Sequence, residues 1–222
     1  MTTVGLIGSG RIGGTVARLA VAAGHPVILS NSRGPDTLTE LAGELGPLAR
    51  AGTGREAAGG GDLVVVTIPF RAFQNVDPWP LGGKVVIDTC NYYPQRDGQI
   101  PELDSGALTS SELIQRHLPS SAVVKAFNNI HYRHLESLAR PAGAADRSYL
   151  PIAGDDAAAK AAVTAFLDSI GYGAIDAGPL AEGWRQQPGT PVYGAPYGSF
   201  QDPKGSPASA DAIRKALAAA GR

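Results

Sequence analysis

The chain is poor in cysteine, in aromatic residues and in net charge. A single cysteine, Cys90, excludes an intramolecular disulfide and fits a reducing compartment, so we expect a cytoplasmic protein. A net charge of −1 excludes the broad basic surface typical of nucleic-acid binding. No apolar run approaches the roughly 18 residues that would indicate a membrane span. Only three residues precede the first predicted strand, which leaves no room for a signal peptide.

The first strong pattern is an apolar run that leads into a glycine-rich turn. Val4 to Ile7 predicts a strand, Gly8-Ser9-Gly10-Arg11-Ile12-Gly13 matches G-x-G-x-x-G, and the apolar spacing that follows predicts a helix. In this context Gly8 permits the tight turn, Gly10 lets the backbone approach a diphosphate, and Gly13 allows close packing of helix and strand. The N-terminus of the helix adds free N–H groups. The sequence therefore predicts a dinucleotide site at residues 8–13.

The end of the second predicted strand, residues 26–30, indicates which dinucleotide fits. An NAD site usually has Asp or Glu there to hold the ribose 2′-hydroxyl, whereas this chain continues with Asn31-Ser32-Arg33. A guanidinium matches a phosphate with a planar fork of donors. We therefore expect NADP(H), with its 2′-phosphate held by Ser32 and Arg33 and assisted by Arg11 from the opposite side.

Strands and helices alternate along the chain, which predicts an α/β fold with a doubly wound, mostly parallel Rossmann-type sheet. Further strands are expected at 48–49, 62–69, 84–88, 122–127, 149–153 and 173–176, with the strand around Pro151 at an edge or irregular. Helices are expected at 38–45, after the capping-box pair Thr109 and Glu112, from Asp155 or Asp156 to Ser169, and at 209–220.

The carboxyl ends of the strands are where such a sheet binds its ligands. Ile68, Pro69 and Phe70 are expected on the nicotinamide side of the cofactor, and Asn91 on its carboxamide or on the second substrate. Phe127, Asn128 and Asn129 follow a later strand and are expected to contact that substrate.

Other polar residues have simpler interpretations. His131 and His134 are three residues apart, but no Asp, Glu or Cys nearby completes a metal site, and an exposed helix start is the better interpretation. Lys125 is expected in a structural ion pair, with Asp88 as a candidate partner, and Cys90 behaves as a small hydrophobic residue. We find no catalytic triad and no Tyr-x-x-x-Lys pair, so no side chain is assigned to acid–base catalysis.

The last forty residues differ in composition. Ten of the 25 residues from 183 to 207 are Gly or Pro, with aromatic residues that include Trp184 among them, and this excludes a regular helix or central strand. We expect an NADP-binding domain at 1–180 and an extension at 181–222 that packs on it. The extension, with Trp184, is a candidate wall of the substrate pocket, a candidate dimer contact, or a flexible linker.

Over residues 3–180 the sequence resembles a known family. VGLIGSGRIGG, NSRGP, DLVVVTIPF, KVVIDTCN and VVKAFNN occur in the order found in the F420H2:NADP oxidoreductases. The resemblance implies a Rossmann domain with a small C-terminal addition, usually dimeric, and direct hydride transfer between nicotinamide C4 and deazaflavin C5. Residues 8–12 would hold the diphosphate, Ile68 and Pro69 would face the nicotinamide, and Phe127 and Asn128 would line the deazaflavin side. The stretch 182–193 departs from the family's plainer ending.

Two other functions remain open from the sequence. One is an NADPH-dependent reductase of a flavin, a quinone or a small carbonyl or imine substrate. The other is a non-catalytic NADPH sensor. Enzymes that reduce imines or β-hydroxyacids carry a large helical domain after the Rossmann fold, and this chain is too short for one.

Overall fold

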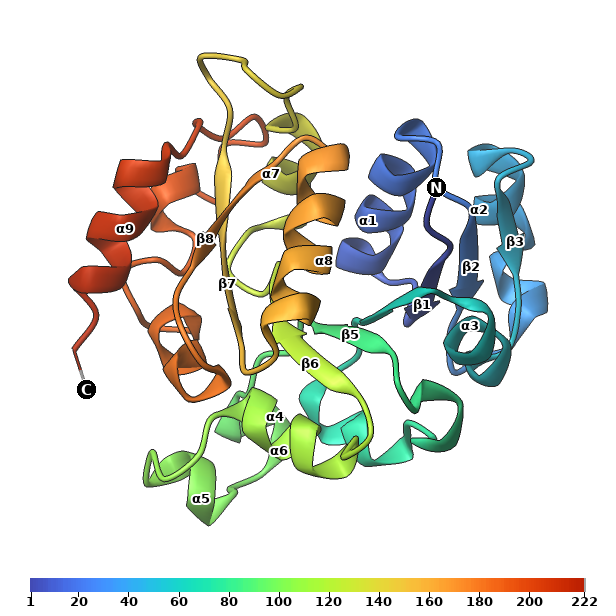
Figure 1. Cartoon of the computed structure of the whole chain (residues 1–222), viewed down its shortest axis with the longest axis horizontal. Coiled ribbons are helices and arrows are strands. Elements are labelled where there is room, and N and C mark those ends of the chain that lie inside the picture. The colour runs from blue at the N-terminus through green and yellow to red at the C-terminus, as the bar shows by residue number, and fades with distance from the viewer. Residues whose placement is uncertain (222) are drawn as a thin grey trace.

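The computed structural model describes residues 1–221 and places one sheet between two layers of helices (Figure 1). The eight strands predicted from the sequence are all present in this part of the chain. They are β1 (Val4–Ile7), β2 (Val27–Ser30), β3 (Ala49–Ala51), β4 (Leu63–Val66), β5 (Val85–Asp88), β6 (Ala122–Lys125), β7 (Tyr149–Gly154) and β8 (Gly173–Asp176).

The strand order is β3-β2-β1-β4-β5-β6-β7-β8, and all neighbours are parallel except β6 and β7. The order reverses at β1, which pairs with β2 on one side and β4 on the other. This reversal is the point at which doubly wound sheets bind ligands. β7 lies between β6 and β8, so of the two expectations around Pro151 the edge strand is wrong, while the irregular pairing is present. Pro151 is tolerated because only Ala153 and Gly154 pair with β6.

The helices follow the strands in chain order. The α-helices are α1 (Arg11–Ala22), α2 (Thr39–Leu45), α3 (Gly54–Gly60), α4 (Pro94–Asp97), α5 (Pro101–Asp104), α6 (Ser110–His117), α7 (Tyr132–Ser137), α8 (Ala157–Ser169) and α9 (Ala210–Ala218). The 3₁₀ helices are η1 (Pro35–Leu38), η2 (Phe70–Asn75), η3 (Trp79–Leu81), η4 (Leu180–Gln186) and η5 (Ala195–Tyr197). The predicted capping box of α6 is present, with the Thr109 hydroxyl accepting from Glu112 N–H. None of the helices in residues 1–221 has the length and apolar character needed to cross a membrane.

The sheet has a hydrophobic core on each face. Alternate residues of β4 serve the two cores: Leu63 and Val65 pack with α1 and α8, whereas Val64 and Val66 pack with η2 and α6. Continuous apolar strands of this kind are typical of a sheet covered on both sides. Figure 1 shows α1 and α8 above β5 and β6 in the view, and α4, α5 and α6 below these strands.

The Gly- and Pro-rich stretch forms no regular helix or strand, only η4, η5 and turns, as predicted. It contributes Tyr197 to the larger core, which also holds Ile213 and Leu217 of α9. Residues 181–221 are therefore joined to β6, β7 and β8 through buried contacts.

Candidate functional site

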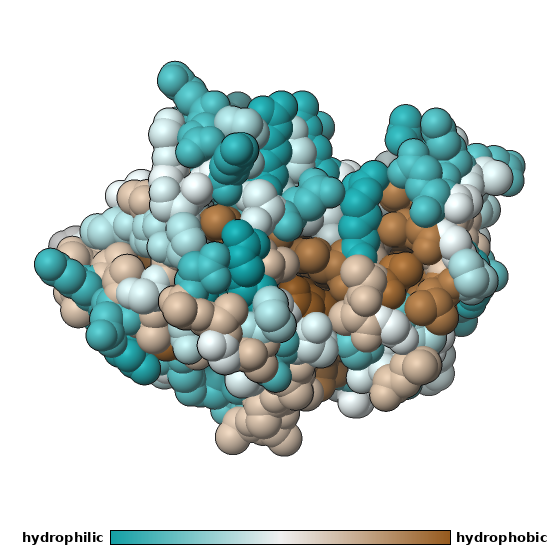
Figure 2. All heavy atoms as spheres, turned by 90° about the horizontal axis from the view of Figure 1, so that it is seen from above, coloured by the Kyte–Doolittle hydropathy of each residue, from teal (hydrophilic) through white to brown (hydrophobic). Residues whose placement is uncertain are grey.

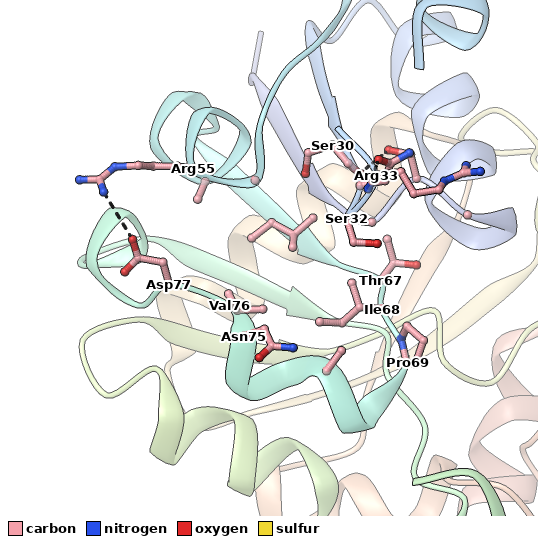
Figure 3. A pocket seen from close by; sticks show the side chains of 18 of the residues that line it. Ser30, Ser32, Arg33, Arg55, Thr67, Ile68, Pro69, Asn75, Val76 and Asp77 are labelled. Atoms are coloured by element: carbon pink, nitrogen blue, oxygen red, sulfur yellow. Dashed lines mark hydrogen bonds and ion pairs between the residues drawn. The ribbon is translucent and has the colours of Figure 1, made fainter. Parts of the chain in front are cut away.

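A cavity of about 470 Å³ opens where the strand order reverses, beyond the carboxyl ends of β1, β2 and β4. Figure 3 shows its walls: the end of β2 on one side, the loop after β4 and η2 below, and α3 on the other side. Eight of the residues expected to bind the cofactor line it: Gly8, Ser9, Gly10, Asn31, Ser32, Arg33, Ile68 and Pro69.

The three glycines at the start of α1 differ in what a side chain at each position would meet. Gly8 has a φ of +103°, and a Cβ there would lie 2.3 Å from the Thr67 carbonyl oxygen. A Cβ on Gly13 would lie 2.2 Å from the Gly8 carbonyl oxygen, so Gly13 lets α1 pack against the turn. Gly10 is different, because a Cβ there meets no protein atom within 4 Å. Of the three glycines, only Gly10 therefore leaves open space for a ligand at the start of α1.

Replacing Gly10 with Ala is expected to weaken NADP⁺ binding by about tenfold, because the methyl group overfills the space beside the helix N-terminus. Thermal stability should stay unchanged, because no protein atom is displaced. Isothermal titration calorimetry with NADP⁺ measures the first effect and thermal unfolding the second. Equal affinity in the two proteins would show that nothing approaches Gly10 closely.

The loop after β2 presents donors to the cavity. Arg33 N–H donates to the Asn31 side-chain oxygen at 2.9 Å, and the Asn31 amide donates to the Thr37 hydroxyl at 2.9 Å. Asn31 therefore shapes the loop by a local side-chain turn. The Arg33 guanidinium makes no hydrogen bond or ion pair within residues 1–221, and no carboxylate lines this end of the cavity. These residues fit the 2′-phosphate of NADP(H).

Three predicted cofactor residues support the turn without lining the cavity. Gly13 is buried under the turn and Ile12 packs against the core, while the Arg11 guanidinium lies 5.2 Å from the centre of the Tyr132 ring. Arg11 thereby connects the start of α1 to α7.

The structure places several of the predicted binding residues away from any open surface. Phe70 and Phe127 are fully buried, and Asn129 nearly so, which excludes direct ligand contact by these side chains in this conformation. Phe127 is also the only residue other than glycine with a positive φ in the described chain, at 62°. Its place in the larger core holds this otherwise unfavourable backbone at the end of β6.

The asparagines after β5 and β6 bind the C-terminal extension. Asn91 and Asn128 exchange hydrogen bonds, and the Asn128 amide also donates to the Gln186 carbonyl at 2.7 Å. The Asn129 amide donates to the Val192 carbonyl at 3.0 Å. In this structure residues 186–197 therefore cover the end of β6 at Asn128 and Asn129, which were expected to contact the substrate. Trp184 is half-buried, lies 4.6 Å from the Arg185 guanidinium and does not line the cavity.

Other titratable side chains are buried and take part in interactions that stabilise the fold. Lys125 and Asp88 form the expected ion pair at 3.1 Å, almost completely buried. Burial and the neighbouring Asp88 raise the pKa of the Cys90 thiol, so this cysteine stays protonated and is a poor nucleophile at neutral pH. His134 is fully buried and bonded to the Asp202 carbonyl, so the expected exposed helix start is wrong for this residue. No group of three or more His, Cys, Asp and Glu side chains is placed to hold a metal ion in the described chain.

The far wall of the cavity was not predicted from the sequence; it is formed by Gly54, Arg55, Ala58, Ala72, Asn75, Val76, Asp77 and Pro80. A signal for part of it is present in the sequence. Thr53 and Glu56 form a capping box that starts α3 directly after β3, and Arg55 lies inside it. The residues of η2 carry no such pattern.

Comparison with known proteins identifies the family. The family model described as "NADP oxidoreductase coenzyme F420-dependent" matches residues 3–92. A hypothetical protein from Sinorhizobium meliloti is 30% identical, with 86% of this chain and 93% of that chain covered and a TM-score of 0.75. A candidate F420-dependent NADP reductase from Arthrobacter sp. FB24 is 26% identical, with 82% and 87% covered and a TM-score of 0.69. The chain belongs to this family of NADP oxidoreductases.

More distant relatives share only the fold with this chain. A reductive aminase from Aspergillus terreus, in complex with NADPH and ethyl-5-oxohexanoate, is 16% identical with a TM-score of 0.59. The match covers 82% of this F420-family chain but only 56% of the aminase. None of the curated proteins compared with the sequence matches it.

Proposed function

We propose that this NADP-dependent oxidoreductase transfers a hydride between NADP(H) and coenzyme F420, a deazaflavin. The observation that carries the proposal is the cavity at the reversal of the strand order, with the open Gly10 and the unpaired Arg33 on one side and Ile68 and Pro69 on another. The family match supports the deazaflavin as partner. The family is often dimeric, and we include a homodimer in the proposal.

The residues of the chain act by holding NADP(H) and orienting its nicotinamide. The N–H groups at the start of α1 and the Ser32 and Arg33 side chains bind the phosphates, because charge-assisted hydrogen bonds are the strong ones. Ile68 and Pro69 present an apolar surface to the nicotinamide, which supplies or accepts the hydride. The one carboxylate that lines the cavity, Asp77, is paired with Arg55 at the end away from Pro69 (Figure 3). Transfer between two redox rings in contact requires proximity and orientation rather than a protein acid or base.

The acceptor would approach beside Pro69, since the extension covers the end of β6. Figure 2 views the molecule from above relative to Figure 1 and shows a hollow near the middle, where hydrophobic residues gather between raised hydrophilic parts. This surface is rich in groups that can pack against a flat ring.

The test is turnover with labelled cofactor. NADPH deuterated at nicotinamide C4 is mixed with oxidised F420, and loss of the deazaflavin's visible absorbance is followed. Direct transfer is expected to place the deuterium at C5 of the reduced deazaflavin. Reduction of FMN or riboflavin, with F420 left unchanged, would instead identify a flavin reductase. Tight NADPH binding without turnover of either would identify a sensor.

A further inference from the structure

The far end of the cavity has no role in the binding described so far. We call it the base compartment, formed by Gly54, Arg55 and Ala58 of α3 and by Asn75, Val76, Asp77 and Pro80 from η2 to η3. The glycine turn and the β2 loop account for the phosphates and the ribose. The base compartment is the part of the cavity that these two segments leave for the base of the dinucleotide.

The lining of the base compartment suits a planar aromatic ring. Ala58, Val76 and Pro80 are apolar, and Val76 and Ala58 are buried behind the cavity surface. Arg55 and Asp77 form an ion pair of 3.8 Å across the mouth, between α3 and the loop after η2 (Figure 3). Both side chains are largely exposed, so the pair adds little to stability and serves as a polar rim.

Asn75 is the polar group inside this rim. Its side chain is exposed and lines the cavity beside Val76. It forms no hydrogen bond with any residue in the part of the chain that the structure describes. A carboxamide offers an N–H donor next to a carbonyl acceptor. The N6/N7 edge of adenine is complementary, with N7 as acceptor and the N6 amino group as donor.

We propose that Asn75 binds the N6/N7 edge of the adenine of NADP(H), so that the site selects the base as well as the 2′-phosphate. The inference rests on the proposed function, because it takes NADP(H) as the ligand. Hypoxanthine is the discriminating base, since it replaces the N6 donor with an acceptor oxygen that opposes the Asn75 carbonyl.

The experiment compares NADP⁺ with nicotinamide hypoxanthine dinucleotide phosphate by isothermal titration calorimetry. Wild-type protein is expected to bind NADP⁺ about tenfold more tightly, the lower range for a bidentate amide–adenine contact. Asn75→Leu should bind the two dinucleotides equally. Gln74→Leu is the matched control, because Gln74 lies on the same 3₁₀ helix, is exposed and does not line the cavity. It should keep the wild-type ratio.

Two results would overturn the inference alone: equal binding of both dinucleotides by wild type, or a preference that survives in Asn75→Leu. Failure of the wild-type protein to bind NADP⁺ at all would overturn the proposed function and the inference together. Because Asn75 is exposed, the variant is expected to unfold at the wild-type temperature, which thermal denaturation checks.

Discussion

Replacing Lys125 with Met is expected to lower the free energy of unfolding by about 3–5 kcal/mol. The Lys125 ammonium is 1% exposed and lies 3.1 Å from an Asp88 carboxylate oxygen and 2.9 Å from the Cys90 carbonyl oxygen. Removing it leaves the Asp88 carboxylate buried without its counter-charge. The hydroxyl of Ser111 and the N–H of Cys90 still donate to Asp88, but neither carries charge.

Urea denaturation of Lys125→Met measures this loss. The double variant Lys125→Met/Asp88→Asn is the informative control, because it removes both charges and should recover most of the stability. A double variant no more stable than the single one would show that the ion pair is not the cause. The pair also fixes the segment from Asp88 to Cys90, just before Asn91, and so supports the carboxyl end of β5.

Replacing Arg33 with Ala is expected to weaken NADPH binding by about 1.5–3 kcal/mol, the value of a hydrogen bond to a charged group. NADH binding should change little, because NADH lacks the 2′-phosphate. The guanidinium has no other partner within residues 1–221, so its removal leaves no buried group unsatisfied. Calorimetry with both dinucleotides measures the difference.

Arg50→Ala is the matched control for Arg33. Arg50 is an exposed arginine on the neighbouring strand β3 and does not line the cavity. The Arg50→Ala substitution removes the same charge as Arg33→Ala, so a general electrostatic effect on binding would appear in both variants. Equal losses for NADPH and NADH in Arg33→Ala would contradict the assignment of Arg33 to the phosphate.

The phosphate side of the cavity was predictable because its determinants are local in sequence. A strand, a glycine turn and a helix follow one another within residues 4–22, and the closest contacts of Gly8 and Gly13 from outside this stretch are with Thr67, directly after β4. The end of β2 is equally compact, because Asn31 shapes its own loop. Such motifs carry their structural context with them.

The other side was not predictable, because it depends on a distant segment. The asparagines after β6 look like ligand-binding residues in the sequence, and only the fold shows that their side-chain N–H groups donate to residues 186–197. Phe127 likewise follows β6 but is fully buried in the larger core. The direction of β7 escaped prediction for a related reason, since an apolar run has the same pattern in a parallel and an antiparallel strand.

The covering of β6 by residues 186–197 also sets an order of events during synthesis. Asn129 leaves the ribosome 68 residues before Tyr197, whose hydroxyl its amide contacts at 3.3 Å. At about 5–20 residues per second, several seconds separate the two. The nascent chain can therefore complete its nucleotide-facing half early, while the neighbouring sheet end keeps unpaired amides in water until its cover emerges.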